Sequence, residues 1–194
     1  MNARNVLIGL AAGCGLLAVL WFAYDKSTAV DFAALNAAEW KPVQAGIPFV
    51  QFDAPFELKD ESRPPLGDER QFLKRNQRFT YQAGNDLQVI ATIVDYLPHV
   101  YIDPNALELS IRGFDKQFGA SNLTFQINDV VMSTYKAKLA EGTFLIGTKK
   151  YIFTRVNVEY RNNYRDLLII VKDGDPEAER LRKRIVGTIQ FQLL

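Results

Sequence analysis

The second half of the chain is a series of strand-like segments joined by short turns, and this pattern restricts the fold more than any other feature. Apolar and polar residues alternate from 123 to 128, which indicates a strand with one wet face. Longer strand patterns follow at about 135–146 and 150–160, and the most apolar segment is 166–171. Such short turns leave no room for a crossover helix, so we expect these strands to pair mainly antiparallel.

The first half adds a strand and a hairpin. Phe49 to Phe56 reads as a strand that ends near Pro55, and residues 71–82 and 87–96 form the two arms of a hairpin. The second arm is apolar on both faces, which is typical of a strand that is covered on two sides.

Two amphipathic helices are expected to cover the sheet, and each begins at an Asp-Pro pair. The first begins at Asp103-Pro104, and its apolar residues repeat at helical spacing. They are Leu107, Ile111, Phe114 and Phe118. The second begins at Asp175-Pro176 and buries Ala178, Leu181 and Ile185 by spacing.

An uncharged apolar run, Val6 to Tyr24, precedes the strands. It is long enough to cross a hydrocarbon core of about 30 Å, which takes roughly 20 helical residues. We therefore predict an uncleaved, single-pass signal anchor in the cell membrane, with the folded domain outside the cytoplasm. Two alternatives stay open: a signal peptide cleaved at Ser27-Thr28-Ala29, and a lipoprotein acylated on Cys14.

The predicted organisation has three parts: a membrane anchor at 1–25, a partly helical linker at 26–46 that Pro42 and Gly46 end, and one extracytoplasmic α/β domain at 47–194. Gly9 and Gly13 form a GxxxG step and are candidates for helix pairing within the membrane. The expected fold class is α+β, with a single N-terminal transmembrane helix followed by a mainly antiparallel sheet of about six to seven strands covered by two amphipathic helices.

Composition excludes several classes of function. The chain has 23 basic and 22 acidic side chains, so no global field attracts nucleic acid. Cys14 is the only cysteine and His99 the only histidine, which leaves little for nucleophilic catalysis or a histidine metal site. No phosphate-loop or dinucleotide fingerprint occurs. We therefore expect no enzyme activity, no catalytic residue, no metal and no cofactor.

The segment from Tyr96 to Ile102 is an aromatic loop between the hairpin and the first helix. Tyr96, His99 and Tyr101 are candidates for binding a protein partner, because aromatic side chains are enriched at interfaces. The alternative is that both tyrosine rings pack beneath the helix.

Several arginines form a basic set that either lines one sheet face and meets lipid headgroups or is scattered over a solvated surface. The second interpretation is favoured. The set is Arg75, Arg78, Arg155, Arg161 and Arg165.

Three short phrases, together with the element order, suggest a family. They are Phe49-Val-Gln-Phe-Asp-Ala-Pro55, Val94-Asp-Tyr96 and Gly187-Thr-Ile-Gln-Phe191. From about Gly46 to Leu194 the chain resembles the PsbP-like superfamily, which includes the photosystem II extrinsic protein, DcrB-like bacterial envelope proteins and a Ran-binding nuclear import factor. That family has no shared catalytic signature.

The resemblance implies a non-catalytic binding or accessory subunit of an envelope or membrane protein complex. The alternatives are a carboxylate-based hydrolase and a module that senses a small ligand or lipid. Buried acids around His99 in a cleft would favour the hydrolase, and a deep aromatic cavity would favour the sensor. An exposed apolar patch would favour the adaptor.

Overall fold

The computed structural model describes residues 29–132 and 135–193, which form two antiparallel sheets and several short helices. The large sheet has seven strands in the order β3-β4-β5-β9-β8-β7-β6, and the small sheet has three in the order β1-β2-β10. The strands are β1 (Lys41–Ala45), β2 (Val50–Ala54), β3 (Lys59–Asp60), β4 (Leu73–Ala83), β5 (Leu87–Tyr96), β6 (Ser121–Met132), β7 (Tyr135–Ile146), β8 (Lys149–Tyr160), β9 (Asn163–Lys172) and β10 (Gln190–Phe191).

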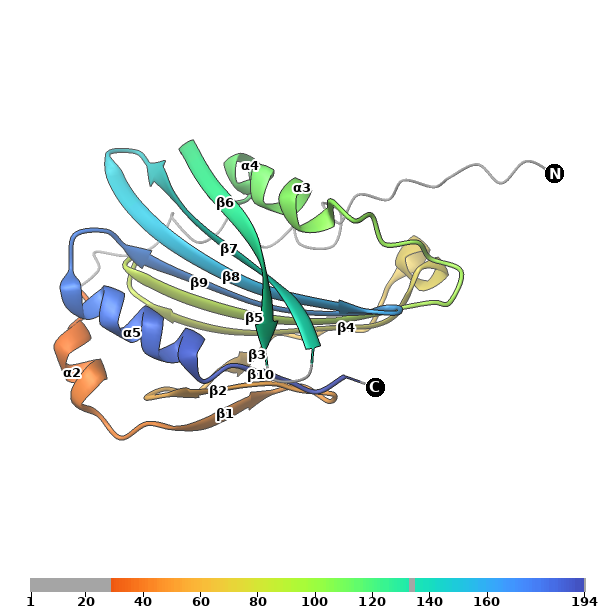
Figure 1. Cartoon of the computed structure of the whole chain (residues 1–194), viewed down its shortest axis with the longest axis horizontal. Helices are drawn as coiled ribbons and strands as arrows, with labels where there is room; N and C mark the ends of the chain where they lie inside the picture. Colours follow the sequence, from red (N-terminus) through yellow and green to blue (C-terminus); the bar gives the residue numbers. More distant parts are fainter. Residues whose placement is uncertain (1–28, 133–134, 194) are drawn as a thin grey trace.

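The described elements form three layers (Figure 1). Helices α3 (Ala106–Arg112) and α4 (Phe114–Phe118) cover one face of the large sheet, which we call the upper face. Helix α5 (Pro176–Gly187), the short helix α2 (Phe32–Ala37) and the small sheet lie against the opposite, lower face. The large sheet therefore separates two hydrophobic cores.

The two central strands, β5 and β9, explain this arrangement. Both are buried along almost their whole length. Alternate side chains of a strand point to opposite faces. Leu167 and Ile169 therefore enter the lower core, while Leu168 and Ile170 enter the upper core. A strand that is apolar on both faces needs a layer on each side, as the sequence of β5 predicts.

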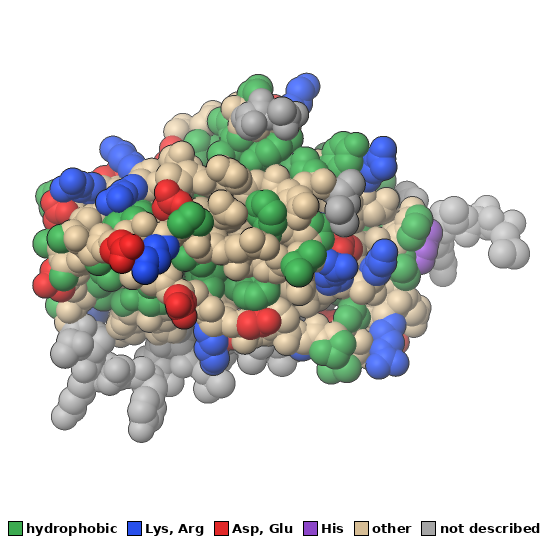
Figure 2. All heavy atoms as spheres, turned by 90° about the horizontal axis from the view of Figure 1, so that it is seen from below, with side chains coloured by type: hydrophobic (Ala, Val, Ile, Leu, Met, Phe, Trp, Pro, Cys, Tyr) green, Lys and Arg blue, Asp and Glu red, His purple; other side chains and the backbone are tan. Residues whose placement is uncertain are grey.

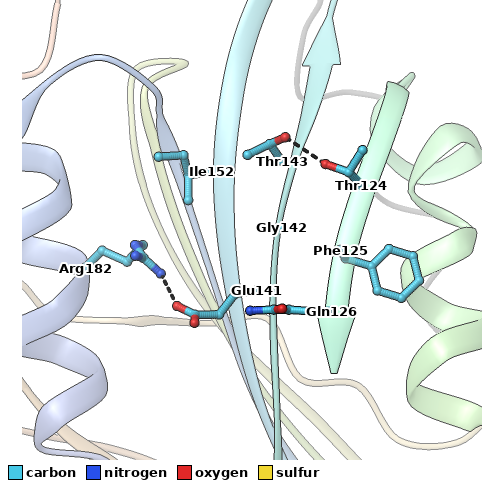
Figure 3. A pocket seen from close by; sticks show the side chains of 8 residues that line it. All are labelled: Thr124, Phe125, Gln126, Glu141, Gly142, Thr143, Ile152 and Arg182. Atoms are coloured by element: carbon cyan, nitrogen blue, oxygen red, sulfur yellow. Dashed lines mark hydrogen bonds and ion pairs between the residues drawn. The ribbon is translucent and has the colours of Figure 1, made fainter. Parts of the chain in front are cut away.

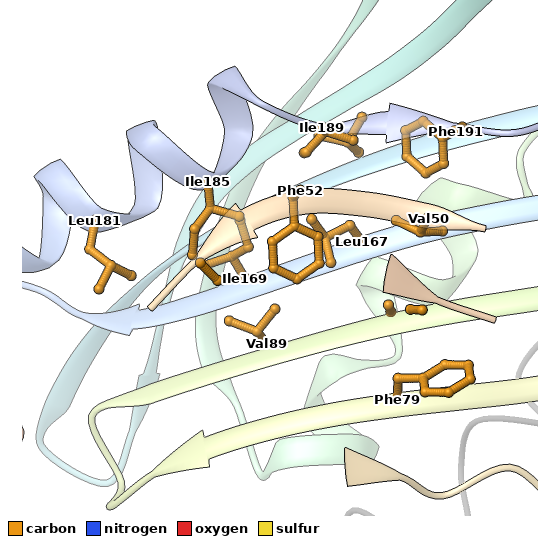
Figure 4. Packing of buried hydrophobic residues seen from close by; sticks show 14 of the residues in the cluster. Val50, Phe52, Phe79, Val89, Leu167, Ile169, Leu181, Ile185, Ile189 and Phe191 are labelled. Atoms are coloured by element: carbon orange, nitrogen blue, oxygen red, sulfur yellow. The ribbon is translucent and has the colours of Figure 1, made fainter. Parts of the chain in front are cut away.

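Helix α5 closes the lower core (Figure 4). The Asp175 carboxylate accepts a hydrogen bond from the backbone N–H of Glu177, and Pro176 occupies the first helical position. Leu181 and Ile185 are fully buried and face the lower core, which they share with Phe52 of β2. The chain then continues into β10, which pairs with β2 and joins the small sheet to the helix.

The expected fold class is wrong in its strand count, its sheet count and its helices. The described chain is mostly β, with ten strands in two sheets. The strand predicted at Phe49–Phe56 contains β2, whose burial alternates, but sequence reasoning missed β1 and β10 and therefore the second sheet that the three strands form. Pro42 does not end a segment here but lies within β1, an edge strand, where a missing N–H is tolerated.

The helices are also shorter than expected. The helix that was predicted to run from Asp103-Pro104 through Phe118 begins at Ala106 and is divided at Gly113 into α3 and α4. Helix α2 and strand β1 fall within the segment predicted as a linker. Asn36 of α2 donates hydrogen bonds to Glu177 of α5, so this segment is packed onto the fold.

The single-pass transmembrane signal anchor is corrected as well. In the described ranges no helix is both long enough and apolar enough to cross a membrane. The longest, α5, has 12 residues and carries charged side chains, whereas a crossing takes roughly 20 apolar residues. The run Val6–Tyr24, with Gly9 and Gly13, lies outside the described residues.

Candidate functional site

One end of the molecule combines three segments that are distant in the sequence (Figure 1). They are the 3-10 helix η2 (Gly67–Gln71) with Leu66 before it, the loop 97–105 after β5, and the β8–β9 turn around residues 160–162. We call this surface the loop end. It contains His99 and Tyr101, two of the candidates for partner binding, and the third, Tyr96, is the last residue of β5, directly before the loop.

Hydrogen bonds connect the three segments. The backbone N–H of Leu97 donates to the carbonyl oxygen of Phe72 over 2.8 Å, which joins the loop to the end of η2. The Asn162 side-chain amide donates to the carbonyl oxygens of Leu97 and Val100, at 3.0 and 3.2 Å. The Tyr96 N–H in turn donates to Asn162 over 2.8 Å. The loop is thereby held on both sides.

Each segment of the loop end exposes a large apolar side chain. Tyr101 is 80% exposed, Leu66 53% and Tyr160 40%. The Arg161 guanidinium lies 5.1 Å from the centre of the Tyr160 ring, a cation–π contact. Figure 2 shows His99, the only histidine, beside hydrophobic side chains at this end. Exposed apolar groups on a hydrogen-bonded framework are typical of interaction surfaces.

The predicted candidates differ in their surroundings. Tyr101 projects into solvent rather than packing beneath the helix, and Tyr96 is half-buried at the end of β5. His99 is exposed, and its Nε2 lies 3.0 Å from the carbonyl oxygen of Gln71.

The carboxylates near His99 in the sequence are occupied elsewhere. Asp95 pairs with Arg165 at 2.8 Å, and Asp103 accepts the backbone N–H of Asn105. Over residues 29–132 and 135–193, no group of three or more His, Cys, Asp or Glu side chains is placed to hold a metal ion.

Sequence reasoning missed a buried ionic cluster beneath α3. Arg155 of β8 donates to the Asp166 carboxylate of β9 over 2.7 Å. The same guanidinium donates to the hydroxyls of Ser110 on α3 and Tyr164 on β9. Because these bonds reach from the sheet to α3, the cluster fixes the helix that follows the loop end.

A second buried arginine lies on the other face of the sheet. Arg165 is 0% exposed and contacts Asp95, the carbonyl oxygen of Val94 and the Asn163 side chain. Burial lowers the pKa of Arg165, and Asp95 opposes this change. The predicted basic set is therefore not one surface, since Arg155 and Arg165 are buried on opposite faces.

The signal for these pairs was present in the sequence. Arg165 and Asp166 stand side by side at the start of the most apolar strand. Adjacent residues of a strand point to opposite faces, so each charge needed its own partner within a core. Burial raises the pKa of the Asp166 carboxyl, and Arg155 opposes that shift.

A shallow hollow of about 470 Å³ lies on the lower face beside α5 (Figure 3). Its lining combines apolar residues with the polar side chains of Gln126 of β6, Glu141 of β7 and Arg182 of α5. The Arg182 guanidinium is already bound by Glu141 and Glu179, each at 2.8 Å. It therefore has little capacity left for an anionic ligand.

Aromatic rings fill the space between the sheet and the helices α3 and α4. The Phe114 ring lies 5.0 to 5.7 Å from those of Phe118, Phe144 and Phe153, mostly edge to face. These residues are buried at close-packed distances. The deep aromatic cavity that would favour a ligand sensor is thus not formed by these residues.

Comparison with known proteins gives no family assignment. No family model matches the chain, and no curated protein is similar enough in sequence to match. Among solved structures, one with a similar backbone is "Crystal structure of LpqN involved in cell envelope biogenesis of Mycobacterium tuberculosis". It is 11% identical, with a TM-score of 0.41, and the match covers 87% of this chain and 100% of that one.

Proposed function

We propose that this chain is a non-catalytic accessory subunit that binds a protein partner through the loop end. The supporting observation is Tyr101, a large aromatic side chain that is 80% exposed on a loop held by hydrogen bonds from both sides. A loop whose backbone is already held loses little conformational entropy on binding, and aromatic side chains are frequent anchors of interfaces.

Leu66 and Tyr160 extend this surface. They come from η2 and the end of β8, the two segments that flank the loop. Their exposure adds apolar area around Tyr101, and Arg161 adds a planar, positively charged guanidinium beside the Tyr160 ring. An aromatic centre with apolar and arginine neighbours has the composition of a protein-binding surface. We also propose that this complex lies in the cell envelope, and this part of the proposal rests on the resemblance to the PsbP-like superfamily.

The two alternative functions have less geometric support. A carboxylate hydrolase would need acids facing His99 or one another across a cleft, but Asp95 and Asp166 are each paired with an arginine. A ligand sensor would need an enclosed chamber, whereas the hollow beside α5 is open and its Arg182 is occupied.

Photo-crosslinking in living cells tests the proposal. A photoreactive phenylalanine replaces Tyr101 in the full chain, and a second strain carries it at Leu109, which is exposed on α3. We expect a discrete crosslinked protein at position 101 that is missing at position 109. After mass spectrometry identifies that protein, Tyr101→Ala should weaken its binding to the purified chain about tenfold or more, as for an interface anchor.

Two results would contradict the proposal. One is the absence of any crosslink from positions 66, 101 and 160. The other is a captured protein that binds wild type and Tyr101→Ala with the same affinity. Leu109→Ser is the control variant, and it should bind the captured protein as wild type does. Because Tyr101 is exposed, its replacement should leave the melting temperature unchanged, so a loss of binding cannot be ascribed to unfolding.

A further inference from the structure

Strand β6 ends the large sheet, and no other described strand pairs with its outer edge. It has 12 residues and pairs on its inner side with β7. The opposite edge strand of the same sheet, β3, has two residues. A long edge presents a row of backbone N–H and C=O groups that a further strand can complete.

The β6 edge lacks the usual protection against pairing. Edge strands are commonly guarded by Lys, by Pro or by an inward-pointing charge. Between Ser121 and Met132 there is no Lys, Arg or Pro, and Asp129 is the only charged residue. A bulge lies between Ser121 and Thr124, but the register is regular from Thr124 to Met132.

The side chains of β6 are self-complementary about its middle. A two-fold axis perpendicular to the sheet through Ile127 keeps each face on its own side and places residues at equal distances from Ile127 opposite one another. On the lower face, Gln126 then lies opposite Asn128 of the second copy, and two side-chain amides can exchange hydrogen bonds. Both residues are exposed in the single chain.

The upper face supports the same register. Ile127 lies opposite its own copy, and Val131 of the second copy, which is 78% exposed in the single chain, comes to lie beside the bulge that contains Leu123. Phe125 lies opposite Asp129 of the second copy. The Arg112 guanidinium lies 5.5 Å from the centre of the Phe125 ring and is paired with Glu108 at 2.7 Å, so Asp129 of the second copy would lie near this ion pair.

We propose that β6 pairs antiparallel with β6 of a second copy, centred on Ile127, so that two large sheets become one continuous sheet. This association is independent of the loop end, which lies on other segments. The buried area is that of one strand edge, so we expect a weak dimer with a dissociation constant on the order of micromolar.

Variants that introduce charges into β6 test the pairing by sedimentation velocity of the full chain over about 1 to 100 μM, a range that spans a micromolar dissociation constant. Wild type should shift from monomer to dimer. Gln126→Lys/Asn128→Lys places ammonium groups opposite each other and should abolish the dimer, since like charges directly opposite are destabilising. Mixing it with Gln126→Glu/Asn128→Glu should restore a heterodimer. Gln82→Lys/Gln190→Lys, at two exposed positions outside β6, is the matched control and should leave the dimer intact.

Cysteine crosslinking tests the register. In a Cys14→Ser background, Ile127→Cys should form an intermolecular disulfide on mild oxidation, because the two Cα atoms lie about 4.5 to 5.5 Å apart in directly opposed positions. Asn128→Cys should not. If wild type stays monomeric over the whole concentration range, the proposal is overturned, and the β6 edge would be open to pairing with a segment of another protein. A dimer that survives the double lysine variant, or a mixture that fails to restore it, also overturns it.

Discussion

Arg165 and Asp166 are neighbours on β9, yet their charged side chains are buried in opposite cores of the molecule. Arg165 reaches Asp95 at 2.8 Å on the lower face, and Asp166 reaches Arg155 at 2.7 Å on the upper face. Both pairs join β9 to an adjacent strand, β5 on one side and β8 on the other. Strand β9, the most apolar strand, is therefore also held to both neighbouring strands by ion pairs near its first residues, on the side of the loop end.

Asp166→Asn should be strongly destabilising. It leaves the Arg155 guanidinium buried without a counter-charge, and breaking a buried pair by removing one partner costs about 3–5 kcal/mol. Urea unfolding monitored by circular dichroism measures the loss. Glu57→Gln, at an exposed position, should change the free energy of unfolding by less than about 0.5 kcal/mol. A loss below about 1 kcal/mol for Asp166→Asn would show that the pair has little net effect.

Glu159→Gln should change the pH dependence of stability. Burial raises the pKa of Glu159 above its ordinary value of 4.5, with Lys138 opposing the shift. The folded state then holds this proton more tightly than the unfolded chain, so ionisation of Glu159 lowers stability as pH rises from 4.5 through the raised pKa. The variant should lack this decline and be at least as stable as wild type at pH 7. Thermal melts from pH 4 to 8 test this prediction. If the melting temperature of the variant falls with rising pH as much as that of wild type, another group causes the decline.

Gly142→Ala should separate β6 from β7. A Cβ at Gly142 would collide with the carbonyl oxygen of Thr124 and lie 2.7 Å from Cε1 of Phe153. Overpacking of this kind costs about 1–3 kcal/mol. Gly187→Ala is the matched control, because a Cβ there meets nothing within 4 Å, and its melting temperature should stay the same or rise slightly. Equal melting temperatures for the two variants would contradict the prediction.

Arg182→Met should loosen α5 from the sheet. The Arg182 side chain is nearly buried and joins Glu179 of its own helix to Glu141 of β7, with a further contact to the Thr154 hydroxyl. Its removal deprives Glu141 of its cationic donor and leaves it with the Thr154 hydroxyl, which donates over 3.3 Å, and we expect this loss to cost about 1–3 kcal/mol. Lys183→Met removes a neighbouring but exposed charge and should change stability by less than about 0.5 kcal/mol. Comparable unfolding midpoints for both variants would contradict this.

Local patterns in the sequence determined the elements that local chemistry controls. The alternation and apolar runs of residues 71–96 and 121–172 correspond to β4, β5 and β6 to β9, and the Asp-Pro pair at Asp175 begins α5. The aromatic loop was also visible as a partner candidate, because several aromatic residues stand close together between two predicted elements, but their exposure was not. Its binding role stays a prediction.

Tertiary structure alone decided the rest, because it depends on contacts between residues far apart in the chain. The strands β1 and β10 carry no clear periodic signal, and both are defined by pairing with β2, which the sequence did predict as a strand. The loop end forms when Asn162, in the turn before the neighbouring strand β9, donates hydrogen bonds to the loop 97–105. The partners of Arg155 and Arg165 likewise follow from strand order, which brings β8 and β5 to either side of β9. A periodic pattern specifies which face of a strand is buried, whereas the strand that lies beside it is chosen by the packing of the whole sheet.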